Sequence, residues 1–173
     1  PRNPFSSSNV LQTIAMMTNN ENVNRFSTGF NLDALLTKSA RSSTKFIGRG
    51  GFDFYNLVTT ALFPRELQSQ NVNNGTSIQG STKNLNTNYI LSLVNVWDVS
   101  EKIGLTTSAG ITQETGDFNN ILDVATQMAP GQSNVDQGGS LTAQQFRNKF
   151  QNQGIFIQEE ASINDAINLN AGV

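Results

Sequence analysis

Two residue types are missing from this 173-residue chain, which has neither cysteine nor histidine. Without cysteine there is no disulfide framework and no thiolate metal site. Without histidine the chain lacks the commonest metal ligand, the usual general base and the partner that a catalytic serine requires. We therefore expect no catalytic residues, no metal site and no cofactor, and we interpret the chain as part of a protein that is not an enzyme.

Charge and long apolar runs are also scarce. Charged residues make up 14% of the chain and the net charge is -2, so there is no basic patch to neutralise phosphates and we expect no nucleic-acid partner. No apolar run approaches the roughly 20 residues of a transmembrane helix. The lack of long apolar runs does not exclude a membrane β-barrel, because each strand of such a barrel needs only about 10 residues, with every second one apolar.

What the chain does contain is alternation between apolar and polar residues, as in half-buried β-strands. Six such segments form three hairpins, at 25–59, 86–114 and 154–173. Long segments rich in Asn, Gln and Gly, at 60–85 and 115–153, separate the hairpins, and 1–24 is of the same kind. In a meander, short turns and long loops then lie at opposite ends of the sheet, as the periplasmic turns and extracellular loops of outer-membrane barrels do.

Short helices are expected inside the long loops. The stretch "SLTAQQFRNKF" offers Thr142 as an N-cap, Gln145 at the capping-box position, and Phe146 and Phe150 one helical turn apart. The stretches "SSNVLQTIAMM" and "DFNNILDVATQMAP" are weaker examples, and the second would end before Pro130. The alternative is that these are helices of a globular α+β protein.

The hairpin at 25–59 predicts two faces of opposite character. A turn within "TKSARSS" places Phe30 opposite Phe52 on one face, and Asp33 opposite Arg49 on the other, where Asp53 also lies. Asp33, Arg49 and Asp53 are candidate ligand contacts. The reading that we favour is a cross-strand ion pair between Asp33 and Arg49 that keeps the sheet rigid.

The hairpin at 86–114 adds two aromatic residues near the strand ends. A turn centred on Ser100 places Trp97 opposite Ile103 and Tyr89 opposite Ile111. These are the places where the aromatic girdles of a membrane barrel lie, although a Trp and a Tyr in a protein core would give the same pattern. In the last hairpin, the register of 154–163 stays open, because adjacent Glu159 and Glu160 cannot lie on one face.

A soluble β-sandwich also alternates, but the polar face here carries Gly, Ser, Thr and Asn in place of the Lys and Glu that usually protect a solvated sheet. We therefore predict an all-β fold, an antiparallel meander that forms part of a large transmembrane β-barrel. Six strands cannot close such a barrel, so we expect a segment of a longer protein. Phe118 and Phe146 in the expected loops are candidate ligand contacts, with packing between loops as the favoured alternative.

The stretches "NPFSSSNVLQTIAMMTNNENVNRFSTGFNLDALL", "GGFDFYNLVTTALFPRELQ", "SIQGSTKNLNTNY", "TTSAGITQETGDFN" and "GIFIQEEASINDAINLNAGV" together resemble the barrel of SusC/RagA-like TonB-linked outer-membrane proteins. The resemblance covers nearly the whole chain. It implies a barrel of about 22 strands in the bacterial outer membrane. It also implies import of oligosaccharides or peptides, a SusD-like surface lipoprotein as partner, and TonB acting through N-terminal parts that this chain lacks.

The alternative function is a surface β-sandwich or adhesin-type module that binds glycans without transport. The two readings differ in what the apolar face contacts. In a barrel wall, Phe30, Phe52, Leu91, Ile111 and Leu169 face outer-membrane lipid, whereas in a sandwich they pack against a second sheet.

Overall fold

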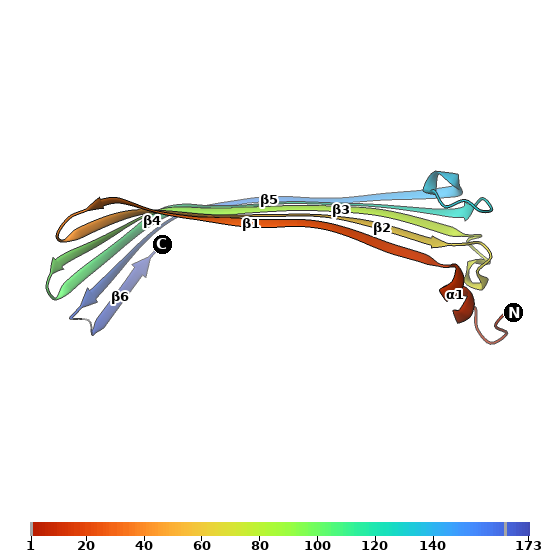
Figure 1. Ribbon diagram of the computed structural model, residues 1–173, viewed down its shortest axis with the longest axis horizontal. Helices are drawn as coiled ribbons and strands as arrows, with labels where there is room; N and C mark the ends of the chain where they lie inside the picture. Colours follow the sequence, from red (N-terminus) through yellow and green to blue (C-terminus); the bar gives the residue numbers. More distant parts are fainter. Residues whose placement is uncertain (1, 165) are drawn as a thin grey trace. The chain divides into compact units, whose positions relative to one another are not determined.

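A computed structural model describes residues 2–164 and 166–173; Pro1 and Asp165, the latter within the expected hairpin at 154–173, lie outside the described residues. The helix α1 (Val10–Met16) precedes the strands β1 (Thr18–Lys38), β2 (Ser42–Phe63), β3 (Thr76–Ser100), β4 (Ile103–Met128), β5 (Gly138–Ile163) and β6 (Ile167–Gly172). Short 3-10 helices η1 (Gln68–Gln70) and η2 (Val135–Gln137) lie in two connections. The strands form one six-stranded sheet in sequence order (Figure 1), which confirms the predicted all-β antiparallel meander.

The strands extend much further than the alternation predicted. The segments 64–75 and 129–137 connect strands, where the sequence predicted loops at 60–85 and 115–153, and β1 begins at Thr18 inside the expected loop 1–24. The added strand residues include "TSIQGSTKN", which is polar at most positions on both faces, so alternation could not reveal it although backbone pairing continues. They also include "GDFNNILDVATQM", in which Phe118, Leu122, Val124 and Met128 share one face, so an alternating pattern was present and was interpreted as a helix.

One of the three expected helices forms. Helix α1 begins after Asn9, whose side chain accepts hydrogen bonds from the backbone N–H groups of Leu11 and Gln12. The helices expected in "SLTAQQFRNKF" and "DFNNILDVATQMAP" are wrong, because these residues belong to β5 and β4. Phe146 and Phe150 are four residues apart, a spacing that places side chains on one face of a helix and equally on one face of a strand.

The chain divides into two compact units. Unit 1 comprises 1–25, 54–84 and 117–148, and it holds α1 and the two longer connections. Unit 2 comprises 26–53, 85–116 and 149–173, and it holds the turns between β1 and β2, β3 and β4, and β5 and β6. The first of these turns is closed by a hydrogen bond from the backbone N–H of Ser39 to the backbone oxygen of Ser42.

The small core of the described residues lies in unit 1. Its buried hydrophobic side chains are Ala61, Leu67, Ala125 and Met128. The connection 64–75 supplies Leu67, which is 1% exposed, and turns through Asn74 and Gly75, both with positive φ. Gln68 fixes the N-terminal segment to this connection, since its Nε2 donates to the backbone oxygens of Asn3 and Ser6.

Contacts between strands assign the side chains of unit 2 to two faces. On the first face, the rings of Phe26 and Phe52 lie 6.1 Å apart, and a Cβ at Gly48 would meet the side chain of Leu91. The same face continues through Tyr89, which hydrogen-bonds Gln113, and ends with Ala161 of β5 opposite Leu169 of β6. We call it the apolar face. Its exposed hydrophobic side chains include Phe26, Phe30, Leu32, Leu36, Phe52, Leu93, Trp97, Val99, Ile103, Ile111, Ile155, Ile157, Ile167, Leu169 and Val173.

The opposite, polar face carries the side chains that alternate with these. Ser27 of β1 contacts Asp53 of β2, and Asn152 of β5 contacts Glu114 of β4. The predicted division between faces is therefore confirmed. The exposed apolar exceptions on this face are Leu35 of β1, Ile90 and Val96 of β3, and Phe150 of β5.

The exact pairs differ from the prediction by small shifts along the strands. The Phe30 ring lies over Gly50, not beside Phe52. Between β3 and β4, the Tyr89 side chain contacts Gln113, two residues beyond the predicted Ile111. A shift of two residues keeps every side chain on its face, which explains why the faces could be right while the partners were wrong.

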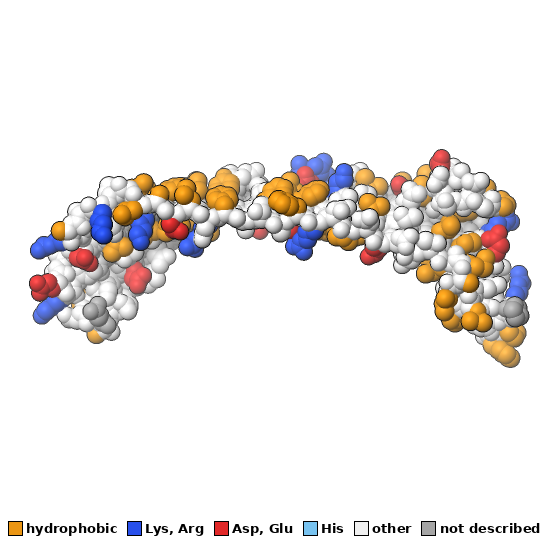
Figure 2. Space-filling view, in the orientation of Figure 1, with side chains coloured by type: hydrophobic (Ala, Val, Ile, Leu, Met, Phe, Trp, Pro, Cys, Tyr) orange, Lys and Arg blue, Asp and Glu red, His pale blue; other side chains and the backbone are white. Residues whose placement is uncertain are grey.

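No described hydrophobic side chain of unit 2 is buried, because the sheet is a single layer. Phe30 and Leu169 are 60% and 58% exposed, and no second sheet covers them among residues 2–164 and 166–173. Figure 2 shows hydrophobic side chains at the surface of the strands, with Lys, Arg, Asp and Glu sparsely placed among them. No helix among the described residues is long and apolar enough to cross a membrane.

Candidate functional site

The polar face of unit 2 brings two carboxylates and several amides together. The Ser27 hydroxyl donates to Asp53 Oδ1 at 2.7 Å, and the Asn152 amide donates to Glu114 Oε2 at 3.5 Å. A cavity of about 190 Å³ is lined by Ser27, Thr28, Gly51, Phe52, Asp53, Asn86, Thr87, Asn88 and Glu114. Hydroxyl, amide and carboxylate groups of this kind can hydrogen-bond the hydroxyls of a sugar or the backbone of a peptide.

Gly51 makes room for part of this cavity wall. A Cβ at Gly51 would lie 2.5 Å from Asn88 Oδ1, closer than real Cβ contacts come. Because Gly51 has no side chain, the amide of Asn88 can lie across β2 from the neighbouring strand. The position of the Asn88 side chain therefore requires a glycine at residue 51.

Arg49 and Asp33 are not joined as expected. Arg49 lines a second cavity of unit 2, about 500 Å³ in volume, together with Asn88 and Glu114. Asp33 is exposed and lies outside the lining of both cavities. Among the described residues no ion pair joins Asp33 to Arg49, so that expected contact is wrong, because the pairing of β1 and β2 is shifted from the predicted one.

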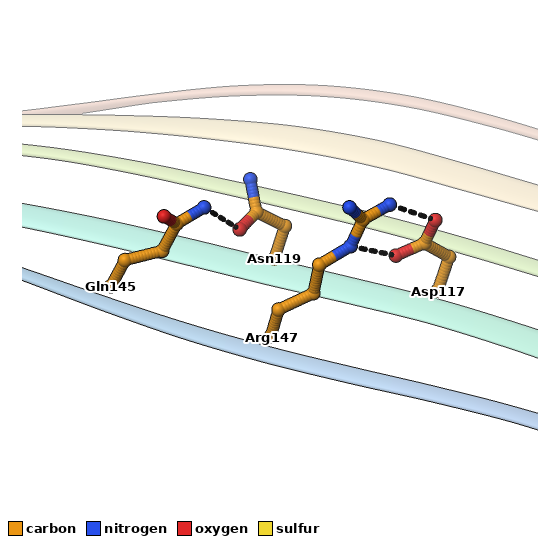
Figure 3. Close-up of polar contacts among 4 residues, drawn as sticks. All are labelled: Asp117, Asn119, Gln145 and Arg147. Atoms are coloured by element: carbon orange, nitrogen blue, oxygen red, sulfur yellow. Dashed lines mark hydrogen bonds and ion pairs between the residues drawn. The ribbon is translucent and has the colours of Figure 1, made fainter.

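In unit 1, two polar pairs link β4 to β5 on one face of the sheet (Figure 3). Arg147 donates from Nε to Asp117 Oδ1 at 3.1 Å and from Nη2 to Asp117 Oδ2 at 2.8 Å, a bidentate ion pair. Beside it, Gln145 Nε2 donates to Asn119 Oδ1 at 2.8 Å. The hydrogen bonds and charge of Asp117 raise the pKa of Arg147 above its ordinary value.

Phe118 and Phe146 form an aromatic pair on the other face of the same two strands. Phe118 stands between Asp117 and Asn119 in β4, so its side chain points away from them. The ring centroids of Phe118 and Phe146 are 6.1 Å apart and the planes are tilted by 58°. Phe146 is 61% exposed, so the pair offers an accessible aromatic surface.

The two girdle candidates lie on the apolar face of unit 2. Trp97 is 49% exposed near the end of β3, three residues before Ser100. The Tyr89 hydroxyl donates to Gln113 Oε1, which also accepts a hydrogen bond from Gln153 Nε2 at 3.0 Å. These polar side chains are neighbours of Leu91, Ile111 and Ile155 along their strands, so Tyr89 marks one limit of the apolar stretch.

Sequence reasoning missed several members of these sites. Asn88 and Glu114 each lie an even number of residues from other polar-face positions of their own strand. The alternation of side chains along a strand could therefore have placed both residues on the polar face. The pair of Asp117 and Arg147 had no such signal, because both residues fell in the segment expected to be a loop. No cluster of three or more potential metal ligands occurs in the part of the chain that the structure describes.

Neither a protein-family model nor a curated protein matches the chain. Solved structures do. The chain is similar to "Structure of the RagAB peptide transporter" with a TM-score of 0.71 and 12% identity, over 89% of this chain and 18% of the other. It is also similar to the RagAB peptide importer in the "open-open" state, with a TM-score of 0.67 and 14% identity, and in the "closed-closed" state, with 0.64 and 12%. Both matches cover 88% of this chain and 17% of the other.

The chain thus spans less than a fifth of the length of the transporter chains that it matches. At such low identity the likeness concerns the fold. It agrees with the resemblance to SusC/RagA-like proteins that the sequence suggested. This chain has the fold of one part of a large β-barrel transporter.

Proposed function

We propose that the chain is a wall and extracellular-loop segment of a TonB-dependent transporter of the bacterial outer membrane. The observation that carries the proposal is the apolar face of unit 2. In β3, β4 and β5, the outward-facing positions of 89–97, 103–111 and 155–163 are mostly apolar, and no second layer formed by the described residues covers them. A surface of this extent needs an apolar neighbour, and lipid is the neighbour that fits a single sheet.

The length of these stretches supports an outer-membrane location. Each is about nine residues, and at about 3.3 Å per residue with a barrel tilt of about 40° it spans roughly 23 Å. The apolar band of outer-membrane barrels is about 25 Å tall. Trp97 and Tyr89 stand near the two limits of the stretch in β3, where interfacial aromatic residues belong. Glu159 is the one carboxylate of β5 on this face, and it stands four residues before Ile163, the last residue of the strand.

The polar face is then the lumen, and we propose that it serves the transported ligand. Asp33, Arg49 and Asp53 of unit 2 and the aromatic pair of Phe118 and Phe146 in unit 1 are the candidate contacts. The similar structures belong to a protein described as a peptide transporter and importer. For this chain we propose oligosaccharides or peptides as ligands, a SusD-like surface lipoprotein as partner, TonB as energy source, and no catalysis.

A test of the membrane-facing surface can use the absence of cysteine from the chain. Leu93→Cys and Ser92→Cys place a thiol on opposite faces of β3 at neighbouring positions. In the complete gene product, reconstituted into bilayers and labelled with a fluorophore, doxyl-labelled lipid should quench the probe at residue 93 strongly and that at residue 92 weakly. Equal quenching at both positions, or none at residue 93, would contradict the proposal and favour burial against a second protein layer.

A further inference from the structure

The apolar face of unit 2 contains a groove that differs from the rest of that face. Its volume is about 550 Å³, and it is lined by Tyr89, Ile111, Thr112, Gln113, Gln153, Gly154 and Ile155. That volume lies in the range of pockets that hold a small molecule. Gly154 lines the groove with its backbone only, because a Cβ at this position would point to the polar face, 2.9 Å from Thr112 Oγ1.

One end of the groove offers hydrogen bonds. Gln113 Oε1 accepts from both the Tyr89 hydroxyl and Gln153 Nε2. Within the described residues, the Nε2 group of Gln113 and the Oε1 atom of Gln153 have no hydrogen-bond partner. The end of the groove thus presents N–H donors beside a carbonyl acceptor. An amide or a hydroxyl group can satisfy both.

The other end is apolar and open. Ile111 is 45% exposed and Ile155 is 87% exposed, and both stand on the outward surface two residues from the glutamines. A ligand that fits the whole groove must therefore be amphiphilic, with a hydrogen-bonding group placed close to a hydrocarbon portion.

The charge of the lining selects among amphiphiles. No Lys, Arg, Asp or Glu lines the groove, so its polar end suits an uncharged amide or hydroxyl. A glycerophospholipid joins its acyl chains through ester groups, which accept hydrogen bonds but have no N–H or O–H group to donate to Gln153 Oε1. An acylated glycolipid, whose chains are joined through amide groups or carry hydroxyls, presents the uncharged groups that the glutamines can bind.

We propose that this groove is a site for one acylated glycolipid of the outer leaflet, bound at its amide or hydroxyl groups by Gln113 and Gln153 and along an acyl chain by Ile111 and Ile155. The proposal rests on the proposed function, because it requires the apolar face to lie against lipid. It adds one specifically bound lipid to a surface that would otherwise contact only bulk lipid of the bilayer.

The test uses the complete gene product, purified from outer membranes in mild detergent and examined by native mass spectrometry for retained lipid. Wild type is compared with a double variant, Gln113→Leu with Gln153→Leu, and with Gln158→Leu, which changes a glutamine on the polar face of β5. Each preparation is also titrated with lipopolysaccharide, phosphatidylethanolamine and phosphatidylglycerol. We expect wild type and Gln158→Leu to retain glycolipid equally, and the double variant to bind it about tenfold or more weakly, because at least two hydrogen bonds are lost.

Three outcomes would overturn the proposal: equal glycolipid binding by the double variant, preferential retention of either phospholipid, or equal weakening in Gln158→Leu. The quenching experiment on Leu93→Cys separates these results from failure of the proposed function. If lipid quenches the probe at residue 93 but glycolipid binding is unchanged in the double variant, the wall faces lipid and only the specific site is wrong. If the probe is not quenched, both proposals fail.

Discussion

Gly110 of β4 is the residue at which a single added methyl group should be most damaging. A Cβ at this position would lie 2.5 Å from the backbone oxygen of Leu91, and 2.7 and 2.8 Å from two atoms of the Phe156 ring. Real Cβ atoms essentially never come within 3.0 Å of another heavy atom. The ring can rotate away, but the carbonyl belongs to the backbone of β3 and moves only with the strand. Gly110→Ala therefore forces β3 and β4 apart locally.

The cost can be bounded from the chemistry of overpacking. Inserting a methyl group into a closely packed site costs about 1–3 kcal/mol, and relief of glycine's backbone entropy returns about 0.5–1 kcal/mol. We expect Gly110→Ala to lower the free energy of unfolding by about 1–2 kcal/mol. Gly104 lies on the same face of the same strand, and its added Cβ would meet only Asp98 Oδ1, at 3.9 Å. Gly104→Ala should change stability by less than about 0.5 kcal/mol, or raise it slightly.

The measurement is urea unfolding of the complete gene product in detergent micelles, followed by the loss of the compact band on unheated gels. The midpoint should fall for Gly110→Ala and stay in place for Gly104→Ala, with the slope unchanged. Equal midpoints for the two variants would refute the reasoning.

A double-mutant cycle separates the two clashes. The three nearest atoms to an added Cβ at Gly116 all belong to the Phe150 ring, so Phe150→Leu should remove most of the damage caused by Gly116→Ala. Phe156→Leu should recover only part of the damage caused by Gly110→Ala, because the Leu91 carbonyl remains. Complete recovery in both cycles would show that the backbone contact is unimportant.

Three further predictions concern polar and aromatic residues of unit 1. Because Asp117 raises the pKa of Arg147, the stability that charged Arg147 contributes is fully present below the pKa that this residue has in the unfolded chain. That stability is lost only as pH rises through the higher pKa of Arg147 in the folded protein. The difference in urea midpoint between wild type and Arg147→Gln should therefore be constant from about pH 7 to about pH 10. Asn56 Oδ1 is buried without a hydrogen-bond partner in the described residues, so Asn56→Leu should raise the unfolding free energy by about 0.5–1 kcal/mol. If the same urea assay shows instead that the unfolding free energy falls by more than about 1 kcal/mol, the oxygen has a partner in the assembled protein. Phe118→Ala and Phe146→Ala should each weaken binding of a labelled oligopeptide or oligosaccharide about tenfold by titration, whereas Leu141→Ala, on the other face of β5, should not.

The sequence predicted the parts of the fold where the two faces of a strand differ. Between Ile103 and Ile111 the contrast between faces is strong, and strand position and faces were correct. Between Tyr89 and Trp97 the contrast is weaker, because Ile90, Val94 and Val96 lie on the polar face, but the strand position and faces were again correct. Where β3 and β5 continue into residues that are mostly polar on both faces, the strands are held by backbone pairing, which leaves little trace in residue type. Capping rules then favoured a helix around Phe146, although a strand accommodates the same spacing.

Pairing partners were harder to predict than faces, and this decided which site residues were found. Periodicity of two fixes the face of Asp53, so its membership of the polar face was correct. The offset between neighbouring strands depends on local turn geometry, which composition does not determine. A small error there gave Asp33 the partner Arg49. The relation of Glu114 to Asn152 was missed for another reason, because Asn152 lay in the expected loop 115–153.

The two faces of unit 2 also explain how a sheet without its own core can keep a fixed shape. Burial of apolar side chains normally fixes a sheet, but no described hydrophobic side chain of this unit is buried. Order within the sheet then depends on contacts between adjacent strands: the Phe156 ring over Gly110, Asn88 over Gly51, and the hydrogen bonds around Gln113. Such contacts fix register without covering the apolar face. That face is therefore free to meet lipid, and the same interlocking keeps the polar side chains opposite in place for a ligand.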